Sequence, residues 1–94
     1  MDSLKIVVEF FGTYLALFAI LFTANKYPKY VHFVVGLAFG ILVFLFSDIS
    51  ANFNPAITLM MVIAKKQPKT DLVSLVIAQL IAAWAAFETF KFIK

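Results

Sequence analysis

The sequence has no cysteine and no arginine, one histidine, and few charges of either sign, since only 14% of its 94 residues are Asp, Glu, Lys or Arg. The absence of cysteine excludes disulfides and thiolate metal sites and leaves the redox compartment open. A single histidine makes a metal cluster unexpected, and no nucleophile, base and orienting group stand at a recognisable spacing. We therefore expect no enzyme, no metal and no cofactor.

What is present is strongly apolar. Hydrophobic residues make up 64% of the chain and the mean hydropathy is +1.00, whereas soluble domains are about half apolar and about a quarter charged. All eight basic residues are lysines between or outside the apolar runs, so the net charge of +3 reflects flanking anchors and indicates no nucleic-acid surface. The composition predicts an integral membrane protein of one compact unit, residues 1–94, without identifying the membrane.

Three apolar runs are long enough to cross a bilayer as helices. A helix rises about 1.5 Å per residue, so about 20 residues cross the roughly 30 Å hydrocarbon core. The pattern predicts spans at about residues 6–24, 31–47 and 72–90. The first run contains Glu9 and lacks a convincing signal-cleavage site, so we expect it to stay in the mature chain.

The segment 48–64 is too short to be a fourth crossing, because its apolar part gives only about 15 Å of helix. Asn54 is a favoured N-cap and Pro55 suits the first helical position, which predicts a half-helix at 55–64. Two placements stay open. A surface helix needs a polar face, to which this segment contributes only Thr58. A re-entrant helix with Asn54 at its deep end, which we favour, needs protein or water around its polar entry.

The start of a re-entrant half-helix has a definite electrostatic character. Its N-terminus carries unpaired N–H groups and a partial positive charge of about half a unit. In the middle of a bilayer this charge repels cations and hydronium, while the Asn54 amide is free to donate hydrogen bonds to a neutral solute. The local sequence therefore favours a constriction that rejects cations and tolerates water.

Four motifs, in order along the chain, resemble those of the aquaporin and glycerol-facilitator (major intrinsic protein) family. They are Glu9-Phe10-Phe11-Gly12-Thr13 in the first span, Gly36-Leu37-Ala38-Phe39-Gly40 in the second, Phe53-Asn54-Pro55-Ala56-Ile57-Thr58 in the signature loop, and Ala78-Gln79 in the third span. The resemblance implies an all-α membrane protein with three transmembrane helices and one re-entrant half-helix. This is the N-terminal half of the family's fold, because its members have two such repeats in inverted orientation.

The resemblance also implies roles for residues of the signature loop. Asn54, Pro55 and Ala56 would face the pore, and Asn52 would take the polar place that many members give to a histidine. We expect Phe39 and Ile57 at the constriction. The family has an arginine after its second signature loop, whereas Ile57 occupies the corresponding position here.

Other residues would support this loop or pack the helices. The resemblance makes Glu9 an acceptor for hydrogen bonds from the loop backbone, with proton relay or an exposed position near the end of the span as alternatives. Gln79 would bond between helices or back the pore. Gly12, Gly36 and Gly40 are expected helix-packing positions.

Three positions are expected to have no pore role. His32 is interpreted as a residue of the membrane interface and Trp84 as a packing or lipid-facing group, while Glu88 is expected to form a surface pair with Lys91.

The expected function is a passive channel half for water, for small neutral solutes such as glycerol, or for both. Its partners would be the lipid bilayer and a second half repeat, either its own antiparallel copy or another chain. Four lysines on each side leave the orientation undetermined. The alternative function is that of a non-conducting membrane interaction protein, a truncated repeat that modulates a full-length channel or is a remnant.

Overall fold

The computed structural model describes residues 3–93, which form four α-helices and one short 3₁₀ turn. In chain order they are α1 (Ser3–Lys26), η1 (Pro28–Tyr30), α2 (Val31–Phe46), α3 (Pro55–Ile63) and α4 (Thr70–Ile93). No strand occurs within the described residues. Three stretches, Ser3–Lys26, Pro28–Phe46 and Thr70–Ile93, are long and apolar enough to cross a membrane. The expected all-α membrane fold is confirmed.

The first and last helices of the chain, α1 and α4, extend beyond the apolar runs that predict them. The predicted spans are 6–24 and 72–90, whereas α1 and α4 are each 24 residues long. At about 1.5 Å per residue such a helix is about 36 Å long, and the long axis of the molecule is 39 Å. Hydropathy identifies only the part of a helix that lies within hydrocarbon. The helices continue at both ends into the residues that flank this part. The second span is shorter than expected by one residue, because α2 ends at Phe46.

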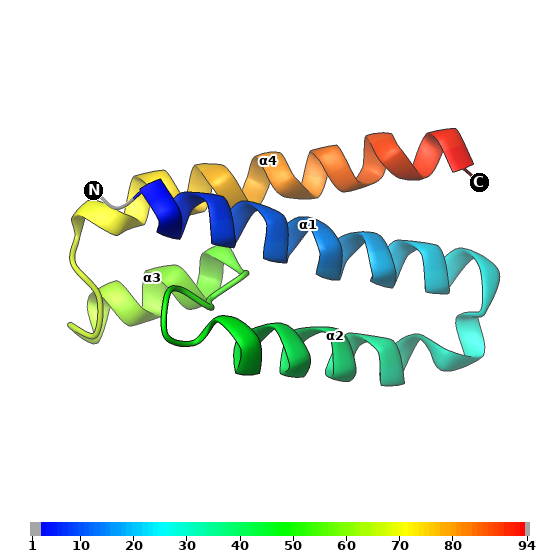
Figure 1. The fold of residues 1–94 in the computed structure, drawn as a ribbon, viewed down its shortest axis with the longest axis horizontal. Coiled ribbons are helices and arrows are strands. Elements are labelled where there is room, and N and C mark those ends of the chain that lie inside the picture. Colours follow the sequence, from blue (N-terminus) through cyan, green and yellow to red (C-terminus); the bar gives the residue numbers. More distant parts are fainter. Residues whose placement is uncertain (1–2, 94) are drawn as a thin grey trace.

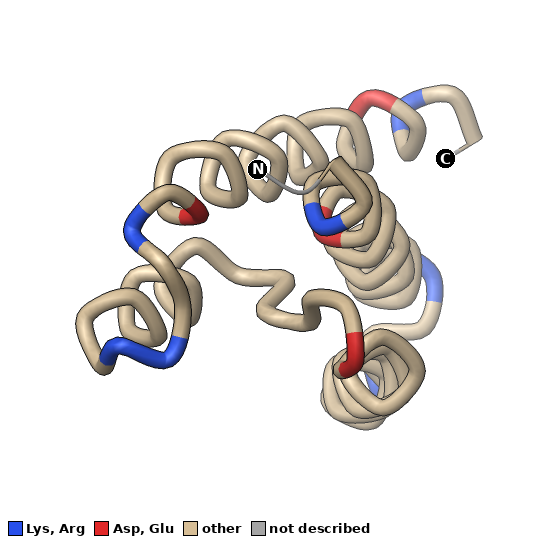
Figure 2. Tube along the Cα trace, turned by 60° about the vertical axis from the view of Figure 1, so that its left-hand side comes forward, with Lys and Arg blue, Asp and Glu red and all other residues tan. Residues whose placement is uncertain are grey.

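The helices are arranged so that one side of the molecule has no covering helix. α1 and α4 lie side by side and run in the same direction, while α2 returns beside α1 (Figure 1). α3 packs against α4, and within the described residues α2 and α3 do not contact each other. Figure 2 shows the connecting segment, residues 47–54, running between α2 and α3. The α1–α4 pair therefore backs this segment, whose other side is not closed by a helix among residues 3–93.

The half-helix α3 occupies only part of the length of the bundle. The segment 47–54 turns back from the end of α2, so α3 begins near the middle of the long axis and runs outward (Figure 1). Asn54 is its N-cap, with its side chain accepting a hydrogen bond from the Ala56 N–H, and Pro55 is its first residue. This predicted start is confirmed. The helix ends at Ile63, one residue earlier than expected, because Ala64 is the C-cap.

Small side chains allow α1 and α4 to approach each other closely. Ala16 on α1 and Ala78, Ala82 and Ala86 on α4 are buried. Lipid tails are as apolar as leucine, so helices associate in membranes through close packing and hydrogen bonds, which favours small residues at the interface. In contrast, α2 has no buried residue, and its Phe44 is 82% exposed.

Lysines are present at both ends of the bundle. At the end where α1 and α4 begin and α3 finishes are Lys5, Lys65, Lys66 and Lys69, and near the opposite end are Lys26, Lys29 and Lys91. Lys94, which we also expect at the second end, lies outside the described residues.

Candidate functional site

The centre of the site is the carboxylate of Glu9, which α1 places against the segment 47–54. Glu9 is fully buried, and each of its oxygens accepts two hydrogen bonds. Oε2 accepts from the Ser50 hydroxyl at 2.5 Å and from the Asn52 N–H at 2.9 Å. Oε1 accepts from the Phe53 N–H at 2.7 Å and from Nε2 of Gln79 at 3.0 Å. One acidic side chain thus joins α1, the loop and α4.

Phe53, directly before the half-helix, has a backbone conformation that is unfavourable for its residue type. Its φ is 55°, and the left-handed region costs a non-glycine residue roughly 1–2 kcal/mol. Two contacts hold it there. Its N–H is bonded to Glu9, and its buried ring lies against Gly12, where an added Cβ would be only 2.1 Å from the ring atom Cε1. Gly12 is therefore required by the close approach of this ring.

Asn54, the N-cap of α3, is an exposed residue. Its Oδ1 is used by the cap, at 2.8 Å from the Ala56 nitrogen, while Asn54 itself is exposed. The Nδ2 group has no hydrogen-bond acceptor among the described residues. Ala56 and Ile57 in the first turn of α3 are exposed as well. The combination is a polar donor and a helix N-terminus, both open to the surroundings near the middle of the bundle.

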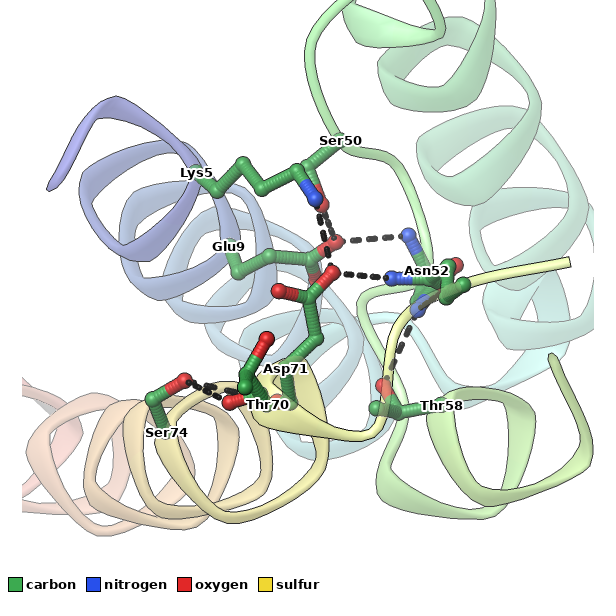
Figure 3. A network of polar contacts seen from close by, with 9 residues as sticks. Lys5, Glu9, Ser50, Asn52, Thr58, Thr70, Asp71 and Ser74 are labelled. Atoms are coloured by element: carbon green, nitrogen blue, oxygen red, sulfur yellow. Dashed lines mark hydrogen bonds and ion pairs between the residues drawn. The ribbon is translucent and has the colours of Figure 1, made fainter. Parts of the chain in front are cut away.

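Thr58 fixes the orientation of the half-helix. It is fully buried, and its hydroxyl accepts hydrogen bonds from Nδ2 of Asn52 at 3.1 Å and from Nε2 of Gln79 at 2.8 Å. The same hydroxyl lies 3.3 Å from the Asn54 carbonyl, to which it donates. Figure 3 shows Asn52 with one dashed line to the Glu9 carboxylate and another to the Thr58 hydroxyl. The half-helix is thus tied to the loop and to α4.

A second set of polar contacts leads from Asn52 to the end of the bundle. Nδ2 of Asn52 also donates to Oε1 of Gln67 at 2.6 Å, and Nε2 of Gln67 donates to Oδ2 of Asp71 at 3.1 Å. Lys5 donates to the same Asp71 oxygen at 2.7 Å. The side chains of Lys5 and Asp71 point toward each other from α1 and from the first turn of α4 (Figure 3).

The structure does not bring all of the predicted residues together. Phe39 is half-buried on α2, which has no contact with the half-helix. Gly36 and Gly40 are exposed, and an added Cβ would meet nothing within 4 Å at either position. The expectation that these two glycines pack helices is therefore wrong for contacts within residues 3–93, because no helix covers that face of α2. Packing against a second chain stays a prediction.

The three residues without an expected pore role are all away from the segment 47–54. His32 is exposed in the first turn of α2, and Trp84 is exposed on α4. Glu88 forms the expected pair with Lys91, at 3.1 Å. Within residues 3–93, no group of three or more His, Cys, Asp or Glu residues could hold a metal ion.

Ser50, Phe53, Gln67 and Asp71 belong to the site without having been identified individually from the sequence. Gln67 and Asp71 could have been found from the sequence, because polar residues that flank a half-helix need partners in a membrane. The left-handed backbone of Phe53 has no signal in the sequence, since neither a glycine nor an asparagine marks it.

Comparison with known proteins agrees with this architecture. The fold and the buried polar site define an α-helical integral membrane protein. Residues 2–94 match the family model of the major intrinsic proteins, and the chain belongs to that family. It is 36% identical over 97 residues to Aquaporin NIP1-1 of Zea mays, a match that covers 93% of this chain and 34% of that protein. The chain thus spans about a third of the length of this curated relative. No solved structure gives a significant match.

Proposed function

We propose that this chain is one half of a passive channel for water and small neutral solutes such as glycerol, and that it conducts when paired with a second repeat. The observation that carries the proposal is the position of Asn54. Its exposed amide and the N-terminus of α3 lie near the middle of a bundle whose long helices can cross a bilayer.

The chemistry of that position suits a neutral permeant. The helix N-terminus supplies a partial positive charge of about half a unit, which is repulsive to cations in a low-dielectric setting. The Asn54 amide donates hydrogen bonds, which a water molecule or a hydroxyl group of a polyol accepts. Ile57, in the same turn, is apolar and adds no charge to the constriction. Water and glycerol share this chemistry, so the proposal covers both.

The need for a second repeat follows from the exposure of Asn54. Lipid tails offer no hydrogen bonds, and an unsatisfied polar group in hydrocarbon costs several kcal/mol. The open side of the segment 47–54 therefore has to be covered by protein that leaves room for solute. A second repeat in inverted orientation, with its own half-helix, would bring a second N-terminus opposite Asn54. It would be a second copy of this chain or a repeat from another sequence.

Within this proposal, the residues that bond to the segment 47–54 support the position of Asn54. Glu9 and Gln79 hold the loop so that Asn54 keeps its position, and Asn52 secures the loop to α3 through Thr58. Phe39 on α2 remains our candidate for the wall of the constriction, to be completed by the second repeat.

Osmotic shrinkage of proteoliposomes tests the proposal. With a second copy of this chain as the second repeat, vesicles that contain the pure chain are expected to shrink faster than empty vesicles, and Asn54→Leu is expected to return the rate to that of empty vesicles. The matched control is Asn25→Leu, the same substitution at an exposed asparagine near the end of α1. Equal shrinkage of Asn54→Leu and the control would remove the channel role. No conduction even by the wild type, together with binding to a full-length channel, would establish the non-conducting interaction protein instead.

Tags at both ends identify the second repeat. The balanced lysines at the two ends allow the chain to insert in either orientation. Equal populations in the two orientations would favour pairing of the chain with its own inverted copy. One fixed orientation would require a repeat from another sequence.

A further inference from the structure

The hydrogen bonds that leave Asn52 reach an ion pair at the end of the bundle. From Asn52 the contacts pass through Gln67 to the Asp71 carboxylate, which Lys5 also contacts. The Asp71 side chain is 3% exposed and that of Lys5 is 24% exposed, so this pair is mostly shielded from solvent. None of the channel roles proposed above uses this ion pair.

The Gln67 amide has only one orientation that suits both of its neighbours. Its Oε1 faces the NH₂ group of Asn52 and its Nε2 faces the carboxylate of Asp71. Turned over, it would place NH₂ against NH₂ on one side and oxygen against carboxylate on the other, and both contacts would be repulsive. The negative charge of Asp71 therefore fixes the amide of Gln67, which in turn provides the acceptor for Asn52.

Asn52 lies two residues before Asn54 and is held on two sides. Its backbone N–H is bonded to Glu9, and its side chain is bonded to Thr58 and Gln67. The loop can shift away from α3 only if these side-chain bonds break. Charged partners strengthen such a chain of hydrogen bonds, because each bond polarises the next in a shielded environment.

We propose that Lys5 and Asp71 are positioning residues, which hold the loop that carries Asn54 through Gln67 and Asn52. The ion pair acts on the loop at a distance, by setting the amide orientation of Gln67. The proposal concerns the position of the loop and stands apart from conduction. Its consequence for permeation rests on the proposed function.

A neighbouring lysine provides the matched control. Lys5 and Lys66 line the same polar cavity of about 280 Å³, together with Ser50, Asn52 and Gln67. Lys66 is exposed and has no ion-pair partner among residues 3–93. Removing either lysine takes one positive charge from this cavity, yet only Lys5 is bonded to Asp71. A difference between the two variants therefore reports the chain of hydrogen bonds.

Hydrogen–deuterium exchange of the full chain in lipid nanodiscs measures loop position directly. In Lys5→Met and Gln67→Met, the hydrogen-bonded amides of Asn52, Phe53 and Ala56 are expected to exchange at least about tenfold faster. A hydrogen bond to a charged group contributes about 1.5–3 kcal/mol, and 1.4 kcal/mol is tenfold. Lys66→Met is expected to leave them unchanged. Equal loop exchange in Lys5→Met and Lys66→Met would overturn the proposal.

Two further variants separate loop positioning from a simple tie between helix ends. Lys5→Arg keeps the charge and is expected to preserve loop protection. The exchanged pair Lys5→Asp with Asp71→Lys restores attraction between α1 and α4, but it places a cation beside Gln67 and turns its amide over. We expect protection to return at the helix ends and to stay lost in the loop. Recovery of both regions would show that the pair only joins the helices.

The exchange result does not depend on whether the chain conducts. If it does conduct, Lys5→Met should also raise the proton leak relative to water permeability, because a displaced Asn54 no longer presents its helix N-terminus at the constriction. If the variants show the expected differences in hydrogen–deuterium exchange but the wild-type chain does not conduct, the proposed function is contradicted and the positioning role stays in place.

Discussion

The first two long helices differ in a way that hydropathy alone would misjudge. α2 contains no Asp, Glu, Lys or Arg, yet it has no buried residue. α1 carries the charged residue Glu9, which is fully buried and accepts four hydrogen bonds from the loop and from α4. In water the more apolar helix would be the more buried one. In a membrane apolar side chains are satisfied by lipid, whereas polar ones need protein partners.

The comparison indicates which side of the molecule is complete. Where α1 faces the loop and α4, the buried donors of Ser50, Asn52, Phe53 and Gln79 have an acceptor within the chain. The face of α2, with Gly36, Gly40 and Phe44 exposed, makes no such demand. Substitutions should therefore be costly on the α1 side and mild on α2 until a second chain covers it.

The largest expected effect is that of Glu9→Leu. It leaves the Ser50 hydroxyl and the N–H groups of Asn52 and Phe53 without an acceptor, while Gln79 keeps its bond to Thr58. At roughly 1–3 kcal/mol for each unsatisfied group, the loss of stability should be at least about 3 kcal/mol. Titration with a denaturing detergent, followed by the fluorescence of the single tryptophan Trp84, measures it. Phe44→Leu on α2 is the control and should change stability little. Similar losses for the two variants would show that burial of polar groups does not distinguish the two regions.

The next effect compares glycines. Gly12→Ala introduces a Cβ against the ring of Phe53, and overpacking of this kind typically costs about 1–3 kcal/mol. Gly36→Ala and Gly40→Ala should cost nothing in the single chain, since both positions are open. The same detergent titration checks all three.

A double variant sharpens the glycine comparison. Phe53→Leu removes the ring and should recover much of the loss caused by Gly12→Ala, which would show that the two residues are coupled. If Gly36→Ala or Gly40→Ala weakens pairing between chains without changing the single chain, α2 contacts the second repeat at these glycines. A cost for them in the isolated chain would contradict the open face of α2.

The third prediction compares two ion pairs. Asp71→Asn removes the shielded partner of Lys5 and should cost about 1–3 kcal/mol. Glu88→Gln removes the partner of Lys91, where both side chains are more than a third exposed, and should cost less than about 0.5 kcal/mol. Added salt should reduce any effect of the exposed pair further. If the two variants lose the same free energy of unfolding, at low salt and again at high salt, shielding from solvent does not distinguish the two ion pairs.

Local signals in the sequence account for the helices and for the start of α3. Apolar runs predict the three long helices, and Asn54 with Pro55 predicts the cap, because capping depends on neighbours in the sequence. The helix ends are less predictable, since hydropathy says nothing of polar residues that continue a helix. Glu9 and Gln79 could be selected as loop supports through the family resemblance.

The contacts that complete the site depend on residues far apart in the chain. Gly12 is needed because Phe53 packs on it, whereas Gly36 and Gly40, in a similar setting of apolar residues, face open space. Nothing in the local sequence separates these cases. The bond from Gln67 to Asp71 is local, but its importance arises from Lys5 and Asn52, which other elements bring to it.

The smallest predicted effect lies on the same side as Glu9, at the far half of the α1–α4 interface. The Tyr14 hydroxyl is 2.7 Å from Oγ1 of Thr89, and Thr89 donates its own hydrogen to the Ala85 carbonyl, so Tyr14 is the donor. Tyr14→Phe should cost about 0.6–1 kcal/mol, the usual value of an interhelical hydrogen bond in a membrane. Tyr27→Phe, at an exposed residue near the turn to α2, is the matched control and should cost nothing measurable. Titration of both variants with a denaturing detergent measures the loss of stability. A loss for Tyr27→Phe as large as that for Tyr14→Phe would show that the Tyr14 hydroxyl does not join α1 to α4, and that tyrosine hydroxyls contribute through their place at the membrane surface.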